Sequence, residues 1–151
     1  MRKVILWNVA FACFVVQSAF CDQKIDAKSW QNIGKFNPAM LSKTLGDHVG
    51  QLVAVQFNFR GKDVHHLKPN WYLGSIWQRD AAEKKGFSNV RVLFARKELA
   101  AFESITADAT SSARLTLYGR VERDADNQFY FVRVLGRRAT VDSSGNANVA
   151  W

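Results

Sequence analysis

The chain contains 151 residues, of which 48% are hydrophobic and 23% are charged, and its formal net charge is +8 at neutral pH. This length supports one domain. Both cysteines, Cys13 and Cys21, fall in an N-terminal stretch that we expect to be removed, which excludes a disulfide-stapled scaffold. The modest basic charge is compatible with a nucleic acid, an anionic lipid, an acidic glycan or an acidic protein as partner, although solubility alone would account for it.

The N-terminus has the pattern of a targeting segment. Arg2 and Lys3 form a short basic start, residues 4–20 are almost wholly apolar, and the chain then turns polar. This pattern predicts a secretory signal peptide over residues 1–21. A transmembrane anchor is the alternative, but the apolar run falls slightly short of the roughly 20 residues of a spanning helix. Lipid attachment at Cys21 fits less well, because its neighbours match that pattern poorly. We therefore expect an exported protein, periplasmic or secreted, without a membrane span.

The segment that follows the signal is mixed in character, so we expect residues 22–36 to be extended or loosely ordered. Asn37 and Pro38 then predict a short helix, because asparagine is a good N-cap and proline suits the first helical position. The sequence therefore divides into three parts: a signal peptide (1–21), an N-terminal arm with one short helix (22–49) and a main domain (50–151).

Alternating apolar and polar residues predict five strands in the main domain. The alternation is clearest in the first strand, where Val53, Val55 and Phe57 share one face. Within the second strand, Gly74 suggests a bend or bulge. The predicted strands cover residues 51–60, 71–78, 90–95, 114–122 and 129–135.

The remaining segments connect these strands. Residues 61–68 are expected to form a polar loop. Residues 96–105 are rich in helix formers and carry an apolar stripe, Leu99, Phe102 and Ile105, which predicts one short helix. Residues 139–142 and 147–151 flank a turn and are expected to close a small hairpin.

This order of elements resembles that of the oligonucleotide/oligosaccharide-binding (OB) fold, and in particular the small exported bacterial single-domain members of that fold. The segments that carry the resemblance are GQLVAVQFNF, SNVRVLFARKELAAF and LTLYGRVERDADNQFYFVRVLGR. The resemblance implies a mostly-β protein: a five-stranded, partly open barrel with one helix between strands three and four, preceded here by a short N-terminal helix.

Motifs for catalysis or metal binding are weak. His48, His65 and His66 lack further ligands for a zinc site, since adjacent histidines on an extended loop point apart. The DADNQ segment lacks the glycine and glutamate of a calcium loop. Ser75 has no nucleophile-elbow context, and the acidic residues Asp63, Asp80 and Glu83 are scattered. We therefore predict no enzyme activity, no metal and no cofactor.

A binding surface is better supported. The resemblance implies that ligands lie across strands two and three, flanked by the loops between strands one and two and between strands four and five. Aromatic faces stack on bases or sugars, and basic side chains neutralise phosphates. The candidate residues are Lys62, His65, His66, Lys68, Trp71, Tyr72, Trp77, Arg79 and Arg91.

The alternative is that the tryptophans fill the barrel. Trp71 and Trp77 have the same parity, so both point to one face unless a bulge at Gly74 shifts the alternation. We expect at least one of them to be buried. A similar ambiguity affects the fifth strand, where Phe129 and Phe131 share a face with Arg133.

The sequence therefore favours an exported, non-enzymatic binding module. Its ligand is expected to be a polyanion, either single-stranded nucleic acid or an acidic glycan, or else a protein partner. The alternative function is that of a structural or interaction protein of the cell envelope, with no small ligand. The arginines at positions 60, 91, 114, 120 and 133 all have outward parity. They would form a basic belt on the predicted barrel, or else they are simply its solvated face, which is the commoner case.

Overall fold

The computed structural model describes residues 23–58, 61–79, 87–105, 114–124, 126 and 128–151. The predicted signal peptide, the lipidation alternative at Cys21 and the predicted exposure of Arg60 lie outside these residues. Within them, no helix is both long enough and apolar enough to span a membrane.

The described residues form a mostly-β protein, as predicted, but with ten strands instead of five. The strands are β1 (Gln23–Ile25), β2 (Gly34–Phe36), β3 (Leu52–Asn58), β4 (Gly61–Lys68), β5 (Trp71–Arg79), β6 (Phe87–Ala95), β7 (Arg114–Asp124), β8 (Phe129–Gly136), β9 (Arg138–Val141) and β10 (Ala147–Ala150). The helical elements are α1 (Ala27–Gln31), α2 (Pro38–Thr44), η1 (Leu45–His48), η2 (Arg96–Glu98) and α3 (Leu99–Glu103).

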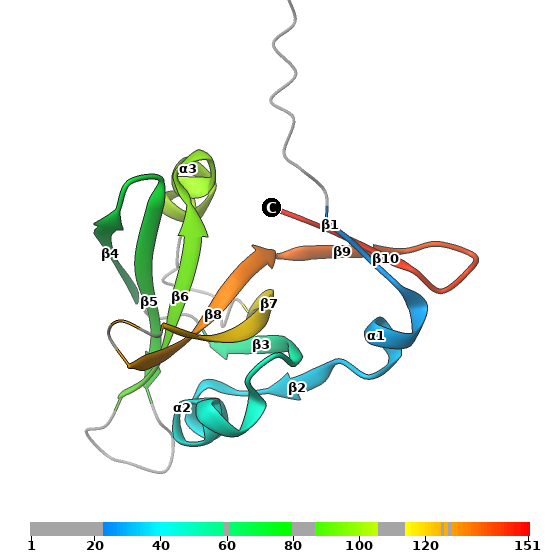
Figure 1. Ribbon diagram of the computed structural model, residues 1–151, viewed down its shortest axis with the longest axis horizontal. Helices are drawn as coiled ribbons and strands as arrows, with labels where there is room; N and C mark the ends of the chain where they lie inside the picture. The colour runs from blue at the N-terminus through cyan, green and yellow to red at the C-terminus, as the bar shows by residue number, and fades with distance from the viewer. Residues whose placement is uncertain (1–22, 59–60, 80–86, 106–113, 125, 127) are drawn as a thin grey trace, which may run out of the picture.

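Seven of the strands form one bent sheet in the order β2-β3-β7-β8-β6-β5-β4. Most neighbours are antiparallel, but β2 pairs in parallel with β3, and β6 pairs in parallel with β8. The five predicted strands correspond to β3, β5, β6, β7 and β8. Figure 1 shows β4, β5 and β6 standing together on one side, with α3 above them and α2 at the lower end.

The segment predicted as a polar loop forms the edge strand β4. Gly61 to His66 pair with β5, and the register shifts between His66 and Lys68. Alternation did not reveal this strand because an edge strand buries little and carries polar residues on both sides. Since β2 and β4 occupy the two edges, the pairings leave an open seven-stranded sheet rather than the five-stranded, partly open barrel that we expected.

Local sequence signals explain the helices. The Asn37 side chain accepts a hydrogen bond of 2.8 Å from the backbone N–H of Met40, and Pro38 follows it, which confirms the predicted helix start. Between β6 and β7, Glu98 accepts a bond of 2.9 Å from the backbone N–H of Ala95. This contact closes the first turn of η2–α3, the single helix predicted between the third and fourth strands.

A second sheet of three strands has the order β1-β10-β9. The predicted hairpin of β9 and β10 is confirmed. Its turn is held by Asp142, whose carboxylate accepts bonds of 2.9 Å from the backbone N–H groups of Ser144 and Asn146. The sequence did not indicate that β1 would pair with β10. Of the two states expected for residues 22–36, the extended one is found in β1 and β2, whereas the helix α1 between them was not predicted.

The main core lies on the inner side of the bent sheet and is closed by α2 and α3. Leu41 of α2 and Phe102 of α3 are fully buried. Gly74 causes no bulge, since it pairs in unbroken register with Val64 and Val92. A Cβ atom at Gly74 would lie 2.8 Å from Cζ of Phe102. The glycine therefore lets the ring of α3 pack directly against the strand.

Candidate functional site: an aromatic–arginine face

Strand β5 has one side toward the core and one side away from it. Gly74, Ile76 and Gln78 are buried on the inner side. Trp71 and Trp77 lie on the opposite side, and both are half-buried. The expectation that at least one of these tryptophans would be buried in the core is therefore wrong, because the unbroken register through Gly74 keeps the pair on the outer side.

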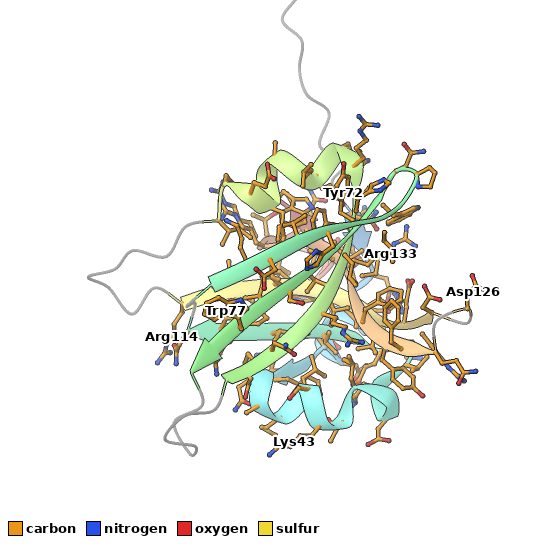
Figure 2. All side chains as sticks on the ribbon, turned by 90° about the vertical axis from the view of Figure 1, so that its left-hand side faces the viewer. Lys43, Tyr72, Trp77, Arg114, Asp126 and Arg133 are labelled. Atoms are coloured by element: carbon orange, nitrogen blue, oxygen red, sulfur yellow. The ribbon has the colours of Figure 1, made fainter. Side chains whose placement is uncertain are left out.

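Strands β6 and β8 extend this outer side. Ser75 pairs with Arg91 of β6, and Leu93 pairs with Arg133 of β8, so both arginines share the side of the tryptophans. Two residues before Arg133, Phe131 lies on the same side, and so does Phe129. We define the aromatic–arginine face as Trp71, Trp77, Arg91, Phe129, Phe131 and Arg133. Figure 2 looks toward β4, β5 and β6, with Trp77 and Arg133 labelled.

The two arginines of this face stack on aromatic rings. The Cζ atom of Arg133 lies 4.9 Å from the ring centroid of Trp71, and that of Arg91 lies 5.4 Å from the centroid of Phe129. Phe129 in turn packs against Phe131 at a centroid distance of 5.8 Å. Such contacts hold a guanidinium flat while its N–H edge stays open to an acceptor.

One carboxylate approaches the face. Glu122 lies 3.7 Å from Nη1 of Arg133, and the two side chains are 33% and 46% exposed. An ion pair this exposed contributes little stability because solvent screens it. Arg133 therefore remains able to exchange this partner for an anionic ligand.

Several residues predicted from the sequence to bind ligand lie on or beside this face. Trp71, Trp77 and Arg91 are members of it. His65 is exposed on β4 opposite Leu73, on the same side of the sheet. The side chains of two further candidates, Lys68 and Arg79, lie outside the described part of the chain.

Three other candidates have the opposite orientation. The Nζ atom of Lys62 donates a hydrogen bond of 2.7 Å to the backbone carbonyl of Glu103, the last residue of α3. It also donates a hydrogen bond to the backbone carbonyl of Ile105, which follows that helix. Burial lowers the pKa of Lys62, and the nearby Glu103 carboxylate opposes this shift. Tyr72 stacks on the core residue Phe94, and His66 meets Tyr72 edge-on at 5.3 Å. These contacts are intramolecular and belong to the inner side of the sheet.

Three members of the aromatic–arginine face were not among the site residues predicted from the sequence: Phe129, Phe131 and Arg133. Their shared parity was visible, but their position beside Trp71 depends on the parallel pairing of β6 with β8. That pairing joins distant segments and has no local sequence signal.

The described histidines do not converge on a metal site. The ring of His48 contacts Phe36 at 4.6 Å, and its Nδ1 lies 2.7 Å from Oε1 of Gln51. His65 and His66 point to opposite sides of β4. Among the residues that the structure describes, no group of three or more His, Cys, Asp or Glu side chains could hold an ion.

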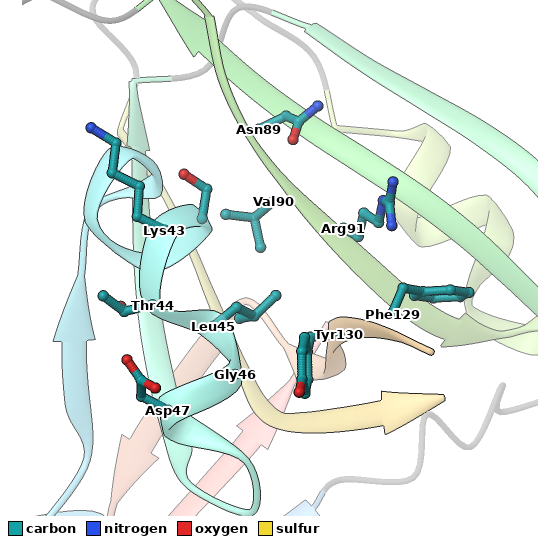
Figure 3. A pocket seen from close by; sticks show the side chains of 11 residues that line it. Lys43, Thr44, Leu45, Gly46, Asp47, Asn89, Val90, Arg91, Phe129 and Tyr130 are labelled. Atoms are coloured by element: carbon teal, nitrogen blue, oxygen red, sulfur yellow. The ribbon is translucent and has the colours of Figure 1, made fainter. Parts of the chain in front are cut away.

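A hollow of about 480 Å³ opens beside the aromatic–arginine face, between α2–η1 and the start of β8 (Figure 3). Arg91 and Phe129 belong to both the hollow and the face. Lys43 and Asp47 come from the helical wall, while Asn89 comes from β6. The face and the hollow therefore form a continuous surface.

No protein-family model and no curated protein matches the chain. Among solved structures, it is similar to a proposed nucleic acid-binding lipoprotein from Klebsiella pneumoniae subsp. pneumoniae, with 16% identity and a TM-score of 0.46 over 70% of this chain and 92% of that one. It is also similar to a proposed aspartyl-tRNA synthetase from Leishmania major, with 11% identity and a TM-score of 0.38 over 80% of this chain and 21% of that one. At these scores, neither likeness carries an argument about function.

Proposed function

We propose that this chain is a non-enzymatic binding module that holds single-stranded nucleic acid on the aromatic–arginine face. The observation that carries the proposal is the pair of outward stacks, Arg133 on Trp71 and Arg91 on Phe129. Rings that are half-exposed offer surfaces for bases, and the guanidinium groups beside them offer bidentate donors to phosphate. An acidic glycan would use the arginines in the same way and is distinguished by the experiment below.

The finer fold, an OB barrel, is part of this proposal. Strands β3 and β4 follow one another in the chain, yet β4 lies at one edge of the large sheet and β3 lies next to the other edge. If these two strands act as halves of one bent strand, the order becomes a roll of five strands with α3 between the third and fourth. In a partly open barrel of this kind, the face of strands two and three binds ligand. Those strands are β5 and β6 here.

The chemistry of the face supports binding rather than catalysis. Stacking and charge neutralisation hold a polymer in place, and neither requires a group that exchanges protons or electrons with it. Export is likewise proposed. It is supported by the basic, apolar and then polar pattern of the first 22 residues, and it would place the module in the cell envelope or outside the cell.

Titration with a labelled single-stranded DNA oligonucleotide at several salt concentrations tests the proposed function. We expect binding at low salt, and log K should fall with log salt by about 0.7 for each neutralised phosphate. Tryptophan fluorescence should be quenched by the oligonucleotide but not by heparin, which has no bases to stack. No binding to single-stranded DNA at low salt would overturn the proposal. Binding of heparin alone would replace the nucleic acid by an acidic glycan.

A second candidate function is docking of an envelope protein on the small sheet. Strand β9 is an edge of this sheet, and Val141 on it is 54% exposed. Exposed edges accept an added strand from a partner. Retention of an envelope protein at high salt, abolished by Thr140→Pro but not by Trp71→Ala, would favour this function. Loss of all retention at high salt would argue against it.

A further inference from the structure

The hollow beside α2 has walls of different chemistry. Lys43 and Gly46 lie on the helical side, whereas Asn89, Arg91 and Phe129 lie on the sheet side, and Tyr130 stands between them (Figure 3). Its volume of about 480 Å³ falls within the roughly 300–1,000 Å³ that small-molecule sites occupy.

The aromatic part of the hollow is built into the fold. Tyr130 lies near the start of β8, where its ring packs against the backbone of η1. A Cβ atom at Gly46 would lie 3.2 Å from two carbons of this ring, so the glycine permits the close approach. The Cζ atom of Arg123 lies 5.9 Å from the ring centroid. The Tyr130 ring is therefore held in place and needs little ordering when a ligand binds.

Two cations from different elements line the same hollow. Lys43 is exposed in the last turn of α2, and its ammonium group has no hydrogen bond or ion pair with any described residue. Arg91 rests on Phe129 and has no carboxylate partner among the described residues. Among the described residues that line the hollow, Asp47 is the one acidic residue beside the two cations Lys43 and Arg91, so positive charge is in excess among them.

Polar recognition is also present. The amide of Asn89 is exposed on the sheet wall and makes no hydrogen bond with the described residues. An amide offers both a donor and an acceptor, as the edge of a base requires. A held ring, two cations and one exposed amide are the groups that recognise a flat heterocycle carrying a phosphate.

We propose that this hollow is a binding site for a nucleoside monophosphate or a ligand of the same chemistry. The heterocycle packs on Tyr130, Asn89 reads its edge, and Lys43 and Arg91 hold the phosphate. The site goes beyond the proposed function, since a small ligand bound here needs no polymer on the aromatic–arginine face. Arg91 belongs to both surfaces, so a ligand in the hollow and a strand on the face would influence each other.

Calorimetric titration of the full chain with adenosine 5′-monophosphate, uridine 5′-monophosphate, adenosine and inorganic phosphate tests the proposal. The monophosphates should bind more tightly than either adenosine or phosphate. Lys43→Gln should weaken monophosphate binding by about tenfold, because a hydrogen bond to a charged group is lost. The matched control is Lys97→Gln, which removes an exposed lysine from η2, beyond the far end of β6, and should leave the affinity unchanged.

Two results would overturn the proposal: equal affinity for phosphate and both monophosphates, or unchanged binding in Lys43→Gln. A further variant separates this site from the face. Trp71→Ala should weaken oligonucleotide binding and leave monophosphate binding intact. If the oligonucleotide fails to bind while the monophosphate binds, only the proposed function fails. If the oligonucleotide binds while the monophosphate does not, only the proposed nucleotide site in the hollow is refuted.

Discussion

The two sides of strand β5 carry similar residues and have different surroundings. On the inner side, Tyr72 stacks on Phe94 at 6.1 Å, and Phe94 stacks on Phe102 at 4.4 Å. On the outer side, Trp71 meets the guanidinium of Arg133. Strand β5 therefore carries aromatic residues on both sides, but the inner ring of Tyr72 packs on another ring, whereas the outer ring of Trp71 packs on a cation.

This difference shows that the group packed against an aromatic ring indicates whether the ring serves folding or binding. The type of aromatic residue alone does not. A ring packed on rings loses its contact with water and contributes to folding. When a guanidinium packs on a ring, its N–H edge stays in solvent, where it can bind an anion. Substitutions on the inner side should therefore lower stability, whereas substitutions on the outer side should lower binding.

The largest effect is expected on the inner side. Phe94→Ala removes a fully buried ring from the stack with Tyr72 and Phe102. The free energy of unfolding should fall by about 3–5 kcal/mol, since a large cavity is left. Urea denaturation followed by circular dichroism measures this loss. A decrease below about 1 kcal/mol would contradict the assignment of this side to the core.

The outer side is tested by Trp71→Ala. Oligonucleotide affinity should fall by about 1–3 kcal/mol, the value of one stacked base, while the free energy of unfolding should fall less than in Phe94→Ala. Fluorescence anisotropy and urea denaturation measure the two quantities. Ser75→Ala, on the same side of β5, serves as the control and should change neither. If Trp71→Ala destabilises the fold as much as Phe94→Ala does, the two sides do not differ in role.

Arg133 sharpens the comparison through charge. Arg133→Gln should reduce the slope of log K against log salt by about 0.7, because one phosphate contact is lost. Arg133→Lys should restore the slope but not the full affinity, since lysine does not stack as a flat guanidinium does. Stability should stay within about 0.5 kcal/mol in both variants. An unchanged slope in Arg133→Gln would remove this residue from the site.

The smallest effect concerns the pH dependence of stability and involves Lys62, on the inner side of β4. Burial lowers its folded-state pKa from the ordinary value of 10.5, against the opposing effect of Glu103. Protonation therefore favours the unfolded chain, so the contribution of Lys62 to stability is present above pH 10.5 and is lost as the pH falls through the folded-state pKa.

The comparison of wild type with Lys62→Met isolates this contribution. As the pH rises toward 10.5, the difference in unfolding free energy should move in favour of the wild type. His65→Ala, on the outer side of β4, should leave the pH profile over this range unchanged. A profile of Lys62→Met parallel to that of the wild type would show that the lysine is not perturbed by folding.

The sequence predicted the parts of the fold that have local signals. The cap at Asn37, the stripe of Leu99, Phe102 and Ile105, and five of the strands were found in this way. Strand β4 was missed because its polar residues do not alternate with apolar ones, as is usual at a sheet edge. Alternation also placed Trp71 and Trp77 correctly on the same side of the sheet. It did not show which side this is, because a period of two cannot tell the inner side of a sheet from the outer one.

The candidate site was predictable only in part, for a related reason. Trp71, Trp77 and Arg91 lie on hairpin strands that are close in sequence, so their proximity followed from the predicted order. Arg133 reaches Trp71 through a non-local parallel pairing of strands, and the hollow requires α2 to pack beside β6 and β8. Both depend on tertiary structure, which local patterns do not encode.

The small sheet has a consequence for how the protein is made. Strand β1 is synthesised before any other described strand, and its partner, β10, is synthesised last. Joining two segments separated by nearly the whole described chain carries a high entropic cost and slows folding. The large sheet can assemble earlier, whereas β1 stays without its partner until β10 has been synthesised. The small sheet is therefore the last part of the described fold to form.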